Sequence, residues 1–297
     1  MLIALLVPVI LASLLFTGVL VKSVVARRAT PTAEAIALGA VVCFFDTLGI
    51  GSFAPSTAWL KFRRIVPDRL IPPTILVGLT IAAVLESIIF LIRLGVKVDP
   101  VLLVGCVLAC LMGGLLGAPL VHRTRVWIVQ MIVAIGLLLA AIAYGMTNLH
   151  LFPGGGTAAS LSMALTILAI AANFAFGVLL NYGVGNYAPT LVVLSLMGMD
   201  PRLCFPIMAG AAALMGCGAG IRHINTGNLD LRVVLGLTIG GIPAVIVAAY
   251  IVVTMPLELL RWLVLVVVLY AASIMFRAAL LGRREHHPEP ATAALAD

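Results

Sequence analysis

The stretch GIGSFAPS at residues 49–56 recurs as GVGNYAPT at residues 183–190, in register and 134 residues later. Both copies follow one pattern: Gly, aliphatic, Gly, polar, aromatic, Ala, Pro, hydroxyl. The same offset places Pro67 on Pro201 and Pro72 on Pro206 without a gap. Two glycines and three prolines in one register indicate an internal duplication built around two interrupted helices, a pattern typical of secondary transporters.

The composition decides which solvent surrounds this repeat. The chain has 297 residues, of which 63% are hydrophobic and 10% are charged. Soluble domains carry about 45–50% apolar and about 25% charged residues. Apolar runs near the roughly 20 residues needed to cross a bilayer occupy most of the chain. We therefore predict an all-α polytopic membrane protein.

The repeat divides the chain into parts. We expect an extra N-terminal transmembrane helix in residues 1–32, a first transmembrane repeat in 33–147 and a connector in 148–159. A second transmembrane repeat follows in 160–281, and a disordered cytoplasmic tail in 282–297. Each repeat is predicted to hold one broken, re-entrant helix and three transmembrane helices. The first helix is read as retained rather than as a signal peptide, because no basic residue precedes its apolar run.

The basic residues predict the topology. If each broken segment returns to its own side, fourteen of the Lys and Arg residues fall on one side and four on the other. That asymmetry fits the positive-inside rule for a bacterial inner (plasma) membrane, with the N-terminus outside and the C-terminus cytoplasmic. Broken segments that crossed would instead separate the basic cluster at 61–69 from the one at 22–32. Three full crossings per repeat, an odd number, make the halves inverted and bring the two breaks face to face near the midplane.

The breaks themselves predict a site for an anion. Glycines let the backbone turn and leave N–H groups without helical partners, and each half-helix starts with the positive end of its dipole. Two such ends form an anion cradle without a buried Lys or Arg. The alternative is that the glycines only allow close packing of helices. The candidate substrate-binding residues are Gly49, Gly51, Ser52, Ser56, Thr57, Asn181, Gly183, Gly185, Asn186 and Thr190.

Two acidic residues lie within apolar runs. Asp46 is one turn before the first break, and Glu86 is in the third apolar segment of the chain. Acids at membrane depth are costly and are associated with proton pathways, because desolvation favours the protonated form. We predict that both residues couple transport to protons. The alternative for Glu86 is a structural hydrogen bond to a neighbouring helix. Neither residue has an acidic counterpart in the other repeat.

Enzymatic chemistry is not indicated. The chain lacks HExxH, and it lacks the GxGD motif with a second aspartate of an aspartyl protease. The Pro153–Gly156 stretch lacks the Lys-Ser/Thr of a phosphate loop. The five cysteines lie in apolar runs without a CxxC pair, so no metal site is predicted, and no cofactor is expected. The net charge of +7 is explained by topology rather than by nucleic acid. The expected partners are the small anion and the bilayer, and a homo-oligomer is left open.

A second stretch suggests a family. Residues 219–230 read AGIRHINTGNLD, and Gly240-Gly241-Ile242-Pro243 follows. Together with the two breaks, this pattern resembles the TauE/SafE sulfite exporter family over residues 33–281. The family's breaks commonly carry three consecutive glycines, and Ser52 and Asn186 stand in the third place here. The resemblance implies a permease for small sulfur-containing anions, such as sulfite or an organosulfonate.

These observations predict a secondary transporter for such an anion, which binds at the paired breaks near the midplane. The chain has no nucleotide-binding motif, so the proton-motive force or the gradient of the anion is the expected energy source. Two alternatives remain open: a channel-like anion pore, and a non-transporting membrane scaffold. The paired polar residues at the breaks speak against the scaffold.

Overall fold

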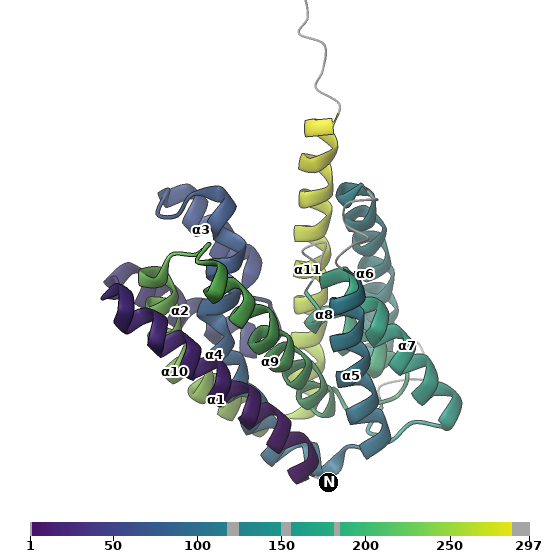
Figure 1. Cartoon of the computed structure of the whole chain (residues 1–297). Coiled ribbons are helices and arrows are strands. Elements are labelled where there is room, and N and C mark those ends of the chain that lie inside the picture. Colours follow the sequence, from purple (N-terminus) through teal and green to yellow (C-terminus); the bar gives the residue numbers. More distant parts are fainter. Residues whose placement is uncertain (1, 118–124, 150–155, 181–184, 287–297) are drawn as a thin grey trace, which may run out of the picture.

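The protein is a bundle of α-helices (Figure 1). The computed structural model describes residues 2–117, 125–149, 156–180 and 185–286. Eight of the helices in this part of the chain are long and apolar enough to cross a membrane. Many large apolar side chains on them face outward, such as Leu14, Ile132 and Leu139. The predicted class, an all-α polytopic membrane protein, is confirmed.

The helices of the first half surround the first break. They are α1 (Leu2–Arg27), α2 (Ala33–Thr47), α3 (Phe53–Arg63), α4 (Ile71–Arg93), α5 (Pro100–Gly117) and α6 (Val126–Asn148). Two short 3-10 turns, Asp68–Leu70 and Gly95–Lys97, flank α4. The expected extra helix is α1, and the first break separates α2 from α3.

The second half has the same order of elements. It consists of α7 (Met163–Leu180), α8 (Tyr187–Leu196), α9 (Pro201–Thr226), α10 (Leu231–Thr254) and α11 (Leu257–His286). The helix α11 continues to His286, past the expected end of the second repeat at residue 281. Residues 287–297 of the expected tail and 150–155 of the expected connector lie outside the described residues.

Local capping repeats between the halves. Pro55 and Pro189 fall in the first turns of α3 and α8, where a missing N–H has no cost. The Asp99 carboxylate accepts from the Leu102 N–H at 2.9 Å at the start of α5. In the same way Asp230 caps the start of α10. These caps lie 131 residues apart rather than 134, so the second half has a few residues fewer between the last repeated proline and its cap than the first half has.

Packing between helices also repeats when the two halves are exchanged. The helix α2 packs along α10, and its counterpart α7 packs along α5. The glycines of these contacts bring backbones together: Gly240 lies against the Ile36 carbonyl, and Gly113 against the Phe174 carbonyl. Small residues of this kind let membrane helices approach closely. At the breaks, in contrast, a Cβ on Gly51 would meet nothing within 4 Å, so close packing does not explain that glycine.

Contacts at the helix ends show where each broken segment enters and leaves. The Arg63 guanidinium at the end of α3 lies 2.8 Å from the Glu34 carboxylate at the start of α2. Met199, just after α8, forms a β-bridge with Ala158, which precedes α7. Each broken segment therefore returns to the end of the molecule at which it begins. We call these ends the α3 end and the α8 end.

The two returns lie at opposite ends. The helix α4 starts at the α3 end, where Thr74 Oγ1 accepts from the Asp230 N–H at 3.0 Å. The chain beyond α4 reaches the α8 end, where the Asp99 N–H donates to Ala159 O at 3.1 Å. The counterparts α4 and α9 pack antiparallel, since Gly210 faces Ser87 and Gly216 faces Thr80. These contacts support the prediction that the halves are inverted relative to each other.

We predict that reporters inserted after Arg64 and after Met199 lie on opposite sides of the membrane. The two positions follow α3 and α8, which end at opposite ends of the molecule. Thiol labelling of single cysteines at these positions, in sealed cells and in inverted vesicles, measures the side. Labelling of both positions from the same side would contradict the arrangement.

We also predict that Gly113→Ala lowers stability, because its Cβ would collide with the Phe174 carbonyl. Overpacking typically costs about 1–3 kcal/mol. The control is Gly136→Ala in α6, where a Cβ meets nothing within 4 Å. Thermal unfolding in detergent should show a loss for the first variant and none for the control. Equal unfolding temperatures would mean that α5 and α7 can separate without cost.

Candidate functional site

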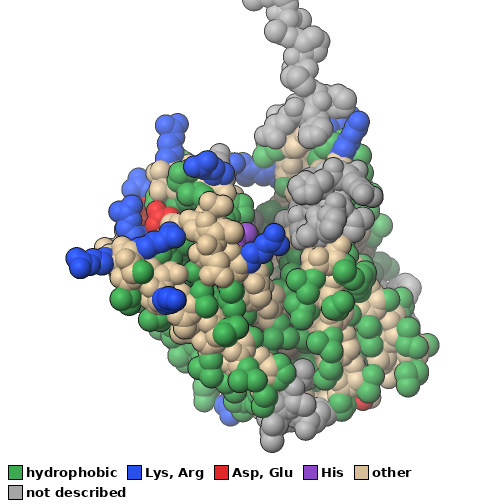
Figure 2. Space-filling view, in the orientation of Figure 1, with side chains coloured by type: hydrophobic (Ala, Val, Ile, Leu, Met, Phe, Trp, Pro, Cys, Tyr) green, Lys and Arg blue, Asp and Glu red, His purple; other side chains and the backbone are tan. Residues whose placement is uncertain are grey.

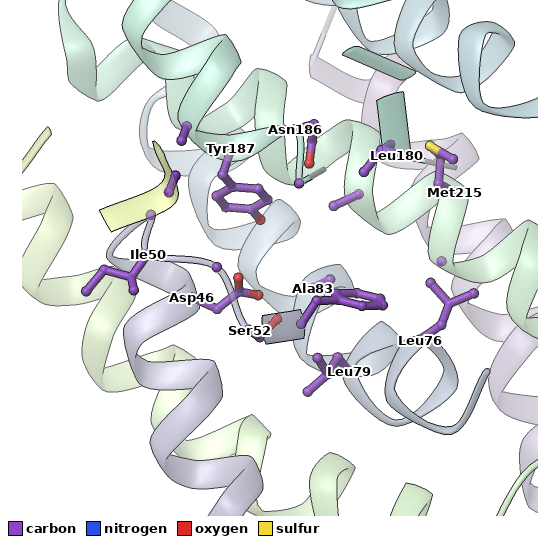
Figure 3. A pocket seen from close by; sticks show the side chains of 18 of the residues that line it. Asp46, Ile50, Ser52, Leu76, Leu79, Ala83, Leu180, Asn186, Tyr187 and Met215 are labelled. Carbon is purple, nitrogen blue, oxygen red and sulfur yellow. The ribbon is translucent and has the colours of Figure 1, made fainter. Parts of the chain in front are cut away.

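A cavity of about 420 Å³ lies between the two helix breaks. Its walls come from α4, α6, α9 and α11, and its polar lining comes mainly from the breaks (Figure 3). The predicted residues that line it are Asp46, Gly49, Gly51, Ser52, Gly185 and Asn186. The two motifs, which lie 134 residues apart in sequence, therefore meet at one cavity.

Ser52 and Asn186 occupy matching places at this cavity. They directly precede α3 and α8, and both are buried. A serine or asparagine in this place usually accepts a hydrogen bond from the first turn of its helix. Neither side chain does so here. Asn186 Nδ2 donates to Met208 O at 3.4 Å, and Ser52 faces the Asp46 carboxylate. The starts of both half-helices are thus not capped by these side chains.

The described glycines of the first break carry a sharp turn. Gly49 and Gly51 have φ values of +96° and +88°, in the region that favours glycine. A Cβ on Gly185 would meet nothing within 4 Å. Gly183 and Asn181, also predicted site residues, lie outside the described residues.

Three predicted residues lie behind the lining of the cavity. Ser56 and Thr190 are matched between the repeats, and both are fully buried one turn into their half-helices. Thr190 Oγ1 donates to Asn173 Oδ1 at 3.1 Å, which ties α8 to α7. Thr57, half-buried on α3, is also not among the lining residues. The geometry gives these hydroxyl groups no direct access to a solute.

The two predicted acids lie close together but are not equally accessible. Asp46 lines the cavity, whereas Glu86 on α4 is 1% exposed. Tyr187 lies between Glu86 and the cavity, and its hydroxyl donates to Glu86 Oε1 at 3.0 Å. The carboxyl groups of Asp46 and Glu86 are near enough for their charges to interact. Figure 3 shows Asp46 and Tyr187, from different breaks, turned toward the same space.

The sequence offers Tyr187 as a hydroxyl donor at the second break, but it does not predict the contact of Tyr187 with Glu86. Tyr187 occupies the aromatic place of the repeated motif, where its counterpart is Phe53. A phenol in one repeat and a phenyl ring in the other was the signal that a polar role is confined to the second break. The acid that Tyr187 contacts is likewise confined to the first half.

The cavity extends from the breaks toward the α3 end. Pro72 and Pro73 at the start of α4 and His223 near the end of α9 line this part. No lining residue comes from the α8 end of the described helices. The sequence places His223 only at a segment end, because α9, with 26 residues, is longer than the apolar run that marks it. Figure 2 shows most of the visible Lys and Arg side chains at the α3 end.

Chemically, the cavity joins an apolar wall to a small polar group of side chains. The polar lining holds one carboxyl group, hydroxyl groups, an amide, a phenol and an imidazole. Within the described residues, no group of three or more His, Cys, Asp or Glu side chains could hold a metal ion. Such a lining suits reversible binding of a small polar solute.

A bundle of membrane-spanning helices with two broken helices around a solute-sized cavity is the architecture of secondary transporters. Residues 165–296 of the chain match the family model described as Sulfite exporter TauE/SafE. The resemblance expected from the sequence is confirmed by this match, which covers the second break and α8 to α11. The family is one of sulfite-exporting membrane transporters. No curated protein and no solved structure matches the chain.

We predict that the bond between Tyr187 and Glu86 stabilises the junction of the two halves. In a double-mutant cycle, Tyr187→Phe and Glu86→Gln should each destabilise the protein, and the double variant should lose less than their sum. Neighbours that share a buried bond typically show coupling of about 0.5–3 kcal/mol. Thermal unfolding in detergent measures the cycle, with the half-exposed Tyr270→Phe as the control. Additive losses would mean that the bond contributes nothing.

Proposed function

We propose that the protein is a secondary transporter for a small anion, either sulfite or an organosulfonate, and that the anion binds in the cavity between the two breaks. One observation carries this proposal: both halves contribute the same motif position, Ser52 and Asn186, to one cavity. Neither side chain caps its helix. Ser52 can turn from the Asp46 carboxylate to a solute, and Asn186 can do so from Met208 O, without uncapping either helix.

The physical basis is the charge at helix starts. The N-terminal turn of a helix carries unpaired N–H groups and the positive end of the dipole, and it binds anions readily. The starts of α3 and α8 both adjoin the cavity. No Lys or Arg of the described residues lines the cavity, so the helix starts at the breaks supply the positive potential. A volume of about 420 Å³ holds sulfite or a small organosulfonate together with water.

Asp46 supports coupling to protons. A carboxylate in the cavity repels an anion, and its protonation removes that repulsion. By linkage, a bound anion then favours the protonated form of Asp46 to the same extent as protonation favours the anion. Glu86 lies next to this carboxyl group and reaches the cavity through Tyr187. We propose that this pair carries the proton that moves with, or against, the anion.

The shape of the cavity favours a carrier over a channel-like pore. Lining residues reach the α3 end and none comes from the α8 end, so the described helices leave one route to the solute site. A carrier shows saturation and counterflow of sulfite in sealed vesicles, and a pore does not. A scaffold shows no flux at all.

The charge distribution supports an orientation. Most basic side chains, including Lys61, Arg63 and Arg64, lie at the α3 end. By the positive-inside rule this end is cytoplasmic in a bacterial inner membrane. The N-terminus then lies outside, the C-terminal end of α11 lies in the cytoplasm, and the cavity opens to the cytoplasm.

We predict that Ser52→Ala and Asn186→Ala each weaken sulfite binding roughly 10- to 100-fold. A buried hydrogen bond to a charged group contributes about 1.5–3 kcal/mol, and about 1.4 kcal/mol corresponds to a factor of ten. Concentration-dependent uptake of sulfite into vesicles gives the half-saturating concentration. Sulfoacetate and sulfate, tested in the same way, rank the solutes.

The matched control is Ser56→Ala, which removes a hydroxyl from the same helix but behind the cavity lining. It should leave the half-saturating concentration unchanged. All variants must elute as folded protein in detergent. Wild-type affinity in both the Ser52 and Asn186 variants would move the site away from the breaks.

A further inference from the structure

The packing of the two halves matches except around α3 and α8. The helix α3 packs on α2 and α4, and correspondingly α8 packs on α7 and α9. In addition, α8 packs on α6 and α11. No comparable contact joins α3 to α6 or α11 in the described part of the chain. The repeat is therefore broken at one place, where one half has a contact that the other half lacks.

The same difference appears in exposure. Tyr187, Leu191, Val192 and Ser195 lie on one face of α8, and all four are buried. Their counterparts, 134 residues earlier, form what we call the α3 face. This face consists of Phe53, Thr57, Ala58 and Lys61, which are exposed or half-exposed. Phe53 is 45% exposed, against 7% for Tyr187. The α3 face is built on the same motif but is more exposed, and it does not pack on α6 or α11 as α8 does.

The helices α6 and α11 form one unit that carries two equivalent faces. They pack antiparallel: Gly145 faces Leu265, and Gly282 faces Trp127. Asn148 Nδ2 also donates to Arg261 O at 3.1 Å. The helix α6 in the first half corresponds to α11 in the second half. When the two halves are exchanged, α6 takes the place of α11 and α11 takes the place of α6.

One of these faces packs on α8, and the other lines the cavity. Tyr144 of α6 faces Ser195 of α8. The counterpart of Tyr144, 131 residues later, is Met275 of α11, and it lines the cavity. Figure 1 shows α6 and α11 beside α8, with α3 on the other side of the bundle. The face that holds Met275 thus belongs to the side of the pair that is not packed on α8.

We infer that the α3 face is a second docking surface for the α6–α11 pair of the same chain. In the structure described here the pair packs on α8, which closes the α8 end and leaves the cavity open at the α3 end. In a second state the pair packs on α3, Met275 takes the role of Tyr144, and Lys61 takes the place of Ser195. The cavity is then closed at the α3 end and open at the α8 end.

Three physical arguments support the second state. Packed interfaces switch between discrete arrangements rather than deforming continuously. The docking faces on α3 and α8 derive from one repeated unit, so the α6–α11 pair can meet both with the same helix geometry. Lys61 suits a seat near a membrane surface, because its alkyl chain can pack on Met275 while the ammonium group stays at the end of the bundle. The inference does not depend on which solute is carried.

Paired cysteines test the two states in membranes with a short bifunctional thiol reagent. Tyr144→Cys/Ser195→Cys should cross-link in the state described here, and Lys61→Cys/Met275→Cys in the second state. The matched control is Lys61→Cys/Phe276→Cys, because Phe276 is the next residue of α11 and points outward. A minor state is commonly populated at about 0.1–10%, and cross-linking accumulates it, so the Lys61/Met275 product should exceed the control about tenfold.

Access to the cavity gives an independent readout. Single-cysteine variants first set the cross-linking conditions and report any reaction of the five buried native cysteines. Ala219→Cys, in the cavity wall, is then added to each cross-linked pair. A membrane-impermeant maleimide should label it only from the α3 side in the Tyr144/Ser195-locked protein. In the Lys61/Met275-locked protein it should label only from the opposite side.

The outcomes separate clearly. If neither Lys61/Met275 nor the second pair described next yields more product than the control while Tyr144/Ser195 is trapped, the α6–α11 pair stays on α8 and the inference is overturned. A second pair, Thr57→Cys/Gly136→Cys, guards against a local failure. Thr57 is the counterpart of Leu191, and Gly136 is the counterpart of Val267. Leu191 and Val267 both lie beside Gly49, so their counterparts should come together in the second state. No solute flux enters these measurements, so a loss of sulfite uptake in the Ser52 variant bears only on the proposed function.

Discussion

The fold depends on one constraint: backbone polar groups at membrane depth must be satisfied or must adjoin a polar cavity. An uninterrupted helix meets this constraint by itself. The breaks at residues 48–52 and before α8 do not, since each one ends a helix and begins another inside the bundle. Bringing both breaks to one cavity solves the problem for the two of them together. It also places two helix starts, with their unpaired N–H groups, where a solute can use them.

The rest of the bundle holds the breaks in this position. The helices α2 and α7 each run along a helix from the opposite half, and glycines bring the backbones into contact. Each half therefore completes the other, and neither forms a closed unit alone. The ion pair of Arg63 with Glu34 and the bridge of Met199 with Ala158 tie each broken segment back to its own end. A short half-helix such as α8 is stable here because its neighbours surround it, not because of its length.

The two halves differ in the side chains near the cavity. Asp46 and Glu86 have no acidic counterparts in the second half, and Tyr187 carries a hydroxyl group that its counterpart Phe53 lacks. The acidic groups near the cavity therefore come from the first half, and the phenol comes from the second. The contact of α6 and α11 with α8 is the second asymmetry, and it leaves one route into the cavity. The duplicated scaffold therefore has an unequal lining and an unequal access to its cavity.

The sequence by itself determined the membrane class, the two breaks and their register, because composition and a repeated Gly/Pro pattern act locally on the chain. It also predicted that Ser52 and Asn186 share a site, since the repeat relates them. Only the tertiary structure decided that Ser56 and Thr190 lie behind the lining of the cavity. They follow Ser52 and Asn186 by one helix turn, and the sequence offers no reason to prefer one of the two pairs. The contact of Tyr187 with Glu86 joins residues 101 positions apart, and no local pattern encodes such a distance. Likewise, the sequence repeat relates α3 and α8 but does not say which of them packs on α6 and α11. That depends on how the α6–α11 pair docks in the folded bundle.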